Sequence, residues 1–420
     1  IIQLVTGPML TGSFRGERVG ACTDCRRFWA SYRAEELNDD DIDEVNNQLV
    51  PTVGTCGVMG TASTMAITTE ALGLMIPNSA CAPAVSADRK RIAENTGKTA
   101  VKIANENLKP SIFLTEKNFL NALMVLSSIG GSTNGLVHLT AMAGRLGIKI
   151  DLGHFDKITK SLPMIVDLKP SGTGYMEDLY KAGGSQRIFY ELRDFLYLVA
   201  KCVNGTSLGE EIKNSAKWSQ NIITDKSNPV FNAGSIAVLK GSLAPNSAII
   251  KQSAATKSLL IHQGRAVVFE GLEDLANRID RDDLDVTKDD ILVLKSIGPK
   301  GGPGMPEAGL IPIPKKLARQ GLKDMVRISD GRMSGTASGT IILHVTPESY
   351  ENGPLAIVQN GDIIKLDVPN RKIDLLISEK EIAERIKKKL KKNIKRRGYN
   401  KIYMEHVTQA DKGVDFDFLI

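Results

Sequence analysis

The sequence predicts an α/β protein in two domains. Residues 1–221 are expected to form an α/β layered domain that is incomplete, and residues 222–420 a β-barrel-like domain with flanking helices. Two observations support this. Short apolar runs alternate with helical patterns in the first part, which is typical of α/β layers. From residue 223 onward, short β-branched runs recur between turns, which is typical of a sheet that closes into a barrel. The polar segment 221–229 is the natural linker.

Several helices are expected in the first domain. A polar, acidic pattern covers 28–46, and Thr115 is placed to cap a helix over 118–128. Further helices are expected at 87–107, at 136–146 and over most of 176–198, with a strand-like run at 163–168. The pair Cys22 and Cys25 has the CxxC spacing of half a zinc site, but no second pair of ligands accompanies it. We therefore interpret this pair as structural.

Cys56 lies in a turn, GTCGVMG, that leads into an apolar helix. A helix N-terminus lowers the pKa of a thiol and favours anions. Cys56 is therefore better placed for chemistry or metal ligation than the other four cysteines. The alternative is a buried cysteine that behaves as a small hydrophobic residue, and the sequence alone leaves both readings open.

Nine β-branched runs predict the strands of the second domain: 235–239, 248–251, 265–269, 291–294, 325–328, 340–345, 355–358, 362–366 and 372–377. Two glycine-rich loops lie among them. One, GGPGMPE at 301–307, ends in Glu307, and the other, at 331–339, carries Ser334 and Thr336. Glycine lets the backbone approach a ligand closely, so the two loops suit a polar small-molecule site or are two surface turns.

Composition limits the classes of partner. The chain has 420 residues, with 42% hydrophobic and 24% charged residues, as in ordinary globular proteins. Aromatic residues make up only 5%, which does not favour nucleic-acid binding by base stacking. Much of the net charge of +6 lies in the run 385–397, which we interpret as a solvated helix face. No apolar run approaches the roughly 18 residues of a membrane span.

The five cysteines are an odd number and indicate a reduced, intracellular protein. The chain lacks an initiator Met and the basic start of a secretory signal. We expect its natural N-terminus to be missing. A cytoplasmic location is expected, and a mitochondrial one is the alternative if the missing segment held a targeting peptide.

Over essentially its whole length the chain resembles the dihydroxy-acid, sugar-acid and phosphogluconate dehydratases. The motifs that carry this resemblance are GPMLTGSFRG at 7–16, GTCGVMGTASTM at 54–65, GGSTN at 130–134, PSGTGYMEDLYKAGG at 170–184, NPVFNAGSIAVLKGSLAPNSAIIK at 228–251, GPKGGPGMPE at 298–307, ISDGRMSGTASG at 328–339 and HVTQADKGVDFDFL at 406–419. The last motif resembles the sugar-acid branch (arabinonate, xylonate) more than the branched-chain amino-acid branch.

The resemblance implies a hydro-lyase that converts a 2,3-dihydroxy acid, here a sugar acid, to a 2-keto-3-deoxy acid. It implies an iron–sulfur cluster as Lewis acid, 2Fe–2S rather than 4Fe–4S, together with Mg²⁺. Ser334 matches the base that removes the C2 proton, and Glu307 matches a Mg²⁺ ligand. Cys56 matches one of three cluster cysteines, and Thr336 a substrate-contacting hydroxyl. A homodimer or homotetramer is expected, with no nucleic-acid or membrane partner.

The family has a further N-terminal segment with the remaining cluster cysteines and Mg²⁺ ligands, and we expect the present chain to lack cluster, Mg²⁺ affinity and turnover without it. Three alternatives remain: a dihydroxy-acid dehydratase of branched-chain amino-acid biosynthesis, a truncated non-catalytic paralogue that binds sugar acids or oligomerises, and a nucleic-acid-binding protein that uses the basic run.

Overall fold

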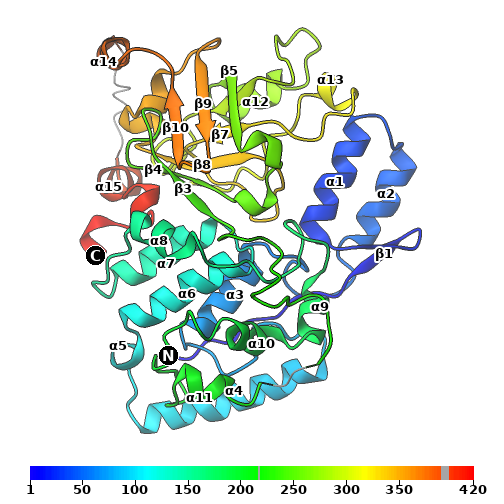
Figure 1. Ribbon diagram of the computed structural model, residues 1–420, viewed down its shortest axis with the longest axis vertical. Helices are drawn as coiled ribbons and strands as arrows, with labels where there is room; N and C mark the ends of the chain where they lie inside the picture. The colour runs from blue at the N-terminus through cyan, green and yellow to red at the C-terminus, as the bar shows by residue number, and fades with distance from the viewer. Residues whose placement is uncertain (216–217, 389–396) are drawn as a thin grey trace. The chain divides into compact units, whose positions relative to one another are not determined.

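The computed structural model describes residues 1–215, 218–388 and 397–420. They form two compact units, each assembled from more than one stretch of chain (Figure 1). The first unit contains Ile1–Tyr32, Leu37–Gly135 and Lys157–Ser235. The second contains Arg33–Glu36, Leu136–Asp156 and Ile236–Ile420. Two short internal segments therefore fold with the C-terminal part of the chain.

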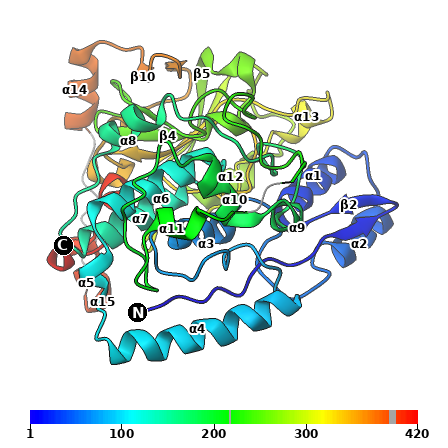
Figure 2. The ribbon, with the colours of Figure 1, turned by 60° about the horizontal axis from the view of Figure 1, so that its bottom comes forward.

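The first unit is mostly helical. Its helices are α1 (Ala21–Arg33), α2 (Asp39–Gln48), α3 (Thr61–Ala71), α4 (Ala87–Asn105), α5 (Pro110–Phe113), α6 (Glu116–Ser128), α9 (Met176–Lys181), α10 (Gly184–Glu191) and α11 (Leu208–Ile212). The longest, α4, is seen lengthwise in Figure 2. Strands β1 (Gly12–Phe14) and β2 (Glu17–Val19) form an antiparallel ribbon. The strand-like run 163–168 forms isolated bridges to residues 231, 223 and 174.

Local capping decides two helix boundaries in this unit. Thr115 caps α6 in a capping box with Asn118, as the sequence predicts. The pattern at 28–46 was predicted as one helix, which is wrong. Asn38 and Asp41 form a second capping box that begins α2, so the pattern is divided between α1 and α2.

The second unit is built on an eight-stranded sheet, most strands of which are labelled in Figure 1. The strand order is β10-β9-β5-β6-β7-β8-β4-β3. The strands are β3 (Ala237–Leu239), β4 (Ser247–Ile250), β5 (Ile261–Phe269), β6 (Ile291–Leu294), β7 (Arg327–Ser329), β8 (Ile341–Thr346), β9 (Ile363–Asp367) and β10 (Lys372–Leu375). Strands β5 to β8 pair in parallel, and the other pairs are antiparallel. Lys240, directly after β3, bridges to Lys372 of β10. This bridge joins the two ends of the sheet, and the predicted barrel-like domain is confirmed.

Alternate residues of the strands face different cores, because successive side chains of a strand point to opposite faces. In β6, Ile291 and Val293 belong to a core with members from all eight strands, which is the barrel interior. Leu292 and Leu294 belong to a second core, which includes Leu275 of α12. Strand β6 is therefore buried on both sides, which explains its unbroken apolar run.

Helices and 3₁₀ turns complete this part of the chain. The helices are α7 (Asn134–Gly144), α8 (Leu152–Thr159), α12 (Leu272–Arg278), α13 (Lys315–Ala318), α14 (Glu379–Lys388) and α15 (Tyr399–His406). The turns are η1 (Gln252–Ala254), η2 (Lys257–Leu259), η3 (Ser349–Glu351), η4 (Pro354–Ile357), η5 (Ala410–Lys412) and η6 (Asp417–Leu419). The strand predicted at 355–358 is wrong, because Pro354 starts η4 there: its fixed φ suits the first position of a helical turn.

Part of the basic run 385–397 forms the end of α14, and residues 389–396 lie outside the described residues. Arg385 is not a solvated side chain as predicted, because it pairs with Asp362 and Glu381 and is only 17% exposed. Throughout the described ranges, no helix is long and apolar enough to cross a membrane.

Candidate active site

The loop between β7 and β8 carries Ser334 and Thr336, and its first end is held by a buried carboxylate. Asp330 accepts backbone N–H bonds from Ser296 (3.2 Å), Ile297 (3.1 Å) and Ser349 (2.8 Å). Burial raises the pKa of Asp330, and these N–H groups act in the opposite direction by stabilising the carboxylate. The start of the loop is therefore anchored to two neighbouring segments of the second unit.

The far end of the same loop is held by an ion pair. Arg327 is fully buried and donates to Asp324 at 2.6 Å, while Asp324 accepts the Thr340 N–H at 3.0 Å. Arg327 also donates to the carbonyl of Ser338, inside the loop. Gly339 has φ +104°, and a Cβ there would lie 2.1 Å from the Arg327 guanidinium. Only glycine fits this position without a shift of the ion pair.

The hydroxyls of Ser334 and Thr336 lie 2.7 Å apart within this anchored loop. The Thr336 N–H also donates to Ser334 Oγ, at 3.3 Å. Ser334 is half-buried and Thr336 is buried. The two predicted side chains therefore form one hydroxyl pair, and the backbone N–H of Thr336 points at the serine oxygen.

The first glycine-rich loop lies against the second. Ser334 N–H donates to Gly309 O at 3.1 Å, and Ala308 N–H donates to Arg332 O at 3.0 Å. Glu307 forms a parallel bridge with Arg332. The Glu307 side chain is exposed. The second unit thus brings together three of the four predicted site residues, Glu307, Ser334 and Thr336, on two paired loops.

Two histidines accompany Arg332. His344 is 2% exposed, and the pKa of its imidazole falls to about 3 because of burial, with a further contribution from Arg332. The pKa of His138 is also lowered, first by burial and then by Arg332. His344 has φ +54° inside β8, and its N–H donates to Gly331 O at 3.1 Å. This local bulge ties the strand to the serine loop.

Lys251 contacts the serine loop from the end of β4. Its Nζ donates to the carbonyl of Gly335 at 3.3 Å, and its side chain is buried. Burial lowers the pKa of Lys251 to about 7. Sequence reasoning missed this contact and those of Arg332 and His344, although Lys251 ends a quoted motif and Arg332 lies two residues before Ser334.

Cys56 belongs to the first unit, in a turn held by backbone bonds. Thr55 N–H donates to Gly7 O, and Met59 N–H donates to Lys169 O, both at 2.9 Å. Cys56 is hydrogen-bonded to the thiol of Cys22, and its sulfur accepts the backbone N–H of Cys22 at the start of α1. The structure therefore brings one cysteine of the CxxC pair next to the predicted cluster cysteine.

The expectation that a helix N-terminus lowers the pKa of Cys56 is wrong. The pKa of the thiol is raised, first by the hydrogen bond with Cys22 and then by burial, and α3 begins only at Thr61. The backbone N–H groups of Cys22 and Val58 act in the opposite direction. Such N–H donors would stabilise a thiolate bound to a metal. The Cys56 turn thus fits a single thiolate ligand.

A complete ligand set is not present among the described residues, because nowhere in them do three or more His, Cys, Asp or Glu come together as a metal site. An iron–sulfur cluster takes about four ligands. Cys56 and Glu307 therefore fit as individual ligands, each within its own unit.

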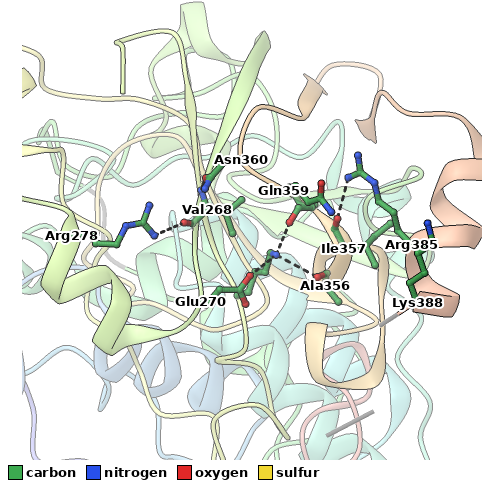
Figure 3. A pocket seen from close by; sticks show the side chains of 11 residues that line it. Val268, Glu270, Arg278, Ala356, Ile357, Gln359, Asn360, Arg385 and Lys388 are labelled. Carbon is green, nitrogen blue, oxygen red and sulfur yellow. Dashed lines mark hydrogen bonds and ion pairs between the residues drawn. The ribbon is translucent and has the colours of Figure 1, made fainter. Parts of the chain in front are cut away.

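A cavity of about 530 Å³ lies elsewhere in the second unit (Figure 3). Two of the cations that line it, Lys295 and Arg385, are already paired. Lys295 donates to Glu270, Ala356 O and Val358 O, which uses all three of its protons. Arg385 is bonded to two carboxylates and to Ile357 O. These two cations have no donor left for an anionic substrate, so we place the candidate site on the serine loop.

Comparison with known proteins assigns the chain to a family. Residues 1–211 match the N-terminal profile of the dihydroxy-acid/6-phosphogluconate dehydratases, and residues 221–414 match the C-terminal profile. The chain belongs to this dehydratase family. The prediction of a hydro-lyase is thereby confirmed, and the two profiles meet close to the linker predicted at 221–229.

Similar dehydratases cover the whole chain. The L-arabinonate dehydratase of Rhizobium leguminosarum bv. trifolii is 43% identical over 100% of this chain and 73% of its own length. The L-arabonate dehydratase of Azospirillum brasilense is 41% identical over 99% of this chain and 73% of its own. The dihydroxy-acid dehydratase of Thermodesulfovibrio yellowstonii is 37% identical over 98% and 74%.

Proposed function

We propose that this dehydratase removes water from a sugar acid, with L-arabinonate as the first candidate, to give a 2-keto-3-deoxy acid. The C2 proton and the C3 hydroxyl leave together as water, and the resulting enol becomes the 2-keto acid. The proposed substrate class rests on the order of the sequence identities to the known relatives. The two relatives named for arabinonate share 43% and 41% identity with this chain, against 37% for the dihydroxy-acid dehydratase.

Ser334 is proposed as the base that takes the C2 proton. A serine hydroxyl is a weak base in water and needs neighbouring donors or charge to become an alkoxide. The Thr336 hydroxyl at 2.7 Å and the Thr336 N–H at 3.3 Å supply two donors. Hydrogen bonds to the charged form favour that form. The anchored ends of the loop keep both donors in place, so no reorganisation is needed when the alkoxide forms.

Glu307 is proposed as a Mg²⁺ ligand and Cys56 as one ligand of a 2Fe–2S cluster in the assembled enzyme. When bound, these groups would supply positive charge near the substrate oxygens and a Lewis acid for the departing hydroxide. The carboxylate of Glu307 is a ligand type that Mg²⁺ prefers, and it is exposed for binding. The Cys56 sulfur lies in a turn with two N–H donors, which suits a thiolate.

A substrate panel tests this proposal. The protein, expressed from the natural start of its gene and purified anaerobically, would be assayed for 2-keto acid formation from L-arabinonate, D-xylonate, D-gluconate and 2,3-dihydroxyisovalerate. We expect the highest kcat/KM on a five-carbon sugar acid. Preference for 2,3-dihydroxyisovalerate would place the protein in the branched-chain amino-acid branch. Turnover of no acid would support the non-catalytic paralogue.

A further inference from the structure

The two buried lysines of the described residues differ in their partners. Lys295 has three acceptors, including Glu270 at 2.8 Å. Lys251 is 8% exposed and donates to a single acceptor, Gly335 O. Within the described ranges, Lys251 forms no ion pair, and no neighbouring charge contributes to its titration. A buried ammonium group without a counter-ion is costly for the folded state, so its place is not explained by stability.

The acceptor of Lys251 lies between the two proposed functional hydroxyls. Gly335 is the residue that separates Ser334 from Thr336, and it is buried. The contact joins residues 84 positions apart in the chain. It therefore fixes the middle of the serine loop, whereas Asp330 and Arg327 fix its two ends.

We propose that Lys251 is a positioning residue for the serine base: it holds the turn at Gly335, and its positive charge favours the alkoxide of Ser334. A nearby positive charge favours the ionised form of an acid. This inference rests on the proposed role of Ser334 as base.

Other charged groups also face the loop and stay the same in every variant below. Arg332 precedes Ser334 by two residues and bridges to Glu307, and His138 and His344 lie near Arg332. The Asp324–Arg327 pair lies at the far end. A comparison of variants at position 251 alone therefore isolates the contribution of Lys251.

Three substitutions separate the hydrogen bond from the charge. Lys251→Met removes both, Lys251→Gln keeps a donor but removes the charge, and Lys251→Arg keeps both. Lys295→Met is the matched control, because Lys295 is also buried but belongs to the cavity described above.

The first measurement is amide hydrogen exchange of the segment 331–339, which needs no activity. The Thr336 N–H donates to Ser334 Oγ, and the Ala337 N–H to Ser334 O. We expect these amides to exchange about tenfold faster in Lys251→Met, since one charge-assisted hydrogen bond is lost. Lys251→Arg and Lys295→Met should leave the segment near the wild-type rate. Unchanged exchange in Lys251→Met would overturn the positioning role.

The second measurement is the pH dependence of kcat on the preferred acid. In Lys251→Met and Lys251→Gln we expect kcat to fall about 100-fold near neutral pH, with a smaller change in KM. Activity should return as the pH rises, because Ser334 then loses its proton without the help of the charge. Lys251→Arg should keep the wild-type kcat at neutral and lower pH, where the Lys251 ammonium group is also charged.

Two results would overturn the electrostatic role: a wild-type profile in Lys251→Gln, or an equally shifted profile in Lys251→Arg. Because Lys251→Gln keeps a polar side chain at this position, it carries this test even where Lys251→Met fails to fold. A wild-type protein that turns over no acid refutes the proposed function, and hydrogen exchange still decides the positioning role.

Discussion

The ion pair between Asp324 and Arg327 gives the most direct test of how the serine loop is held. Asp324→Ala removes the partner of a guanidinium that is 2% exposed. Removal of one partner from a buried ion pair costs about 3–5 kcal/mol, because the remaining charge is buried without compensation. The variant also loses the bonds from Thr340 and Thr256. In a domain of about 200 residues such a loss lowers the melting temperature by about 6–20 °C.

Asp285→Ala is the matched control. Asp285 pairs with Arg265 at 2.6 Å, the same distance as in the Asp324–Arg327 pair, but its side chain is 81% exposed. An exposed pair contributes little, so we expect no clear shift of the melting temperature. Thermal unfolding followed by circular dichroism measures both variants. Equal effects of the two substitutions, or no loss of stability in Asp324→Ala, would refute the argument that burial decides the strength of the pair.

Three further predictions concern the site. Thr336→Val removes the hydroxyl that lies 2.7 Å from the Ser334 hydroxyl. Because one hydrogen bond to the alkoxide is lost, kcat should fall about tenfold or more while the melting temperature stays unchanged. A wild-type kcat in this variant would contradict the prediction. Cys56→Ser should lose the iron that the assembled enzyme binds, whereas Cys22→Ser should keep it. Iron analysis of both variants measures this difference. The opposite pattern would identify Cys22 as the ligand. The pKa of His344 is lowered to about 3 in the folded protein, from the ordinary 6.5. Between these two pH values the imidazole is protonated in the unfolded chain but neutral in the folded protein. The free energy of unfolding should therefore fall as the pH drops from 6.5 toward 3. Urea titrations at pH 7 and pH 5 measure this fall, His344→Gln should reduce it, and an equal fall in both proteins would contradict the assignment to His344.

Strand prediction succeeded where a segment is buried on both faces. The run Ile291–Leu294 has four apolar residues between polar ones, and it forms β6 with the predicted bounds. The run at 355–358 is also entirely apolar but follows Pro354, whose backbone starts a 3₁₀ turn instead. Residue type alone does not separate these cases; the proline does.

The sequence predicted only those parts of the site whose residues lie close together in the chain. Glycine-rich loops indicated Glu307, Ser334 and Thr336, and the structure pairs the two loops through bonds such as Ser334 N–H to Gly309 O. The contact of Cys22 with Cys56 and that of Lys251 with Gly335 join residues far apart in sequence. No local pattern marks such contacts, because they arise from tertiary packing.

The central claim is that Ser334 is the base of a dehydratase, and one variant tests it most directly. Formation of 2-keto acid would be measured for the wild-type enzyme and for Ser334→Ala on the preferred sugar acid, with iron content and melting temperature as controls. We predict that Ser334→Ala loses at least about 100-fold in kcat, in line with the loss of a general base, while it keeps iron and fold. Wild-type turnover in Ser334→Ala would contradict the account.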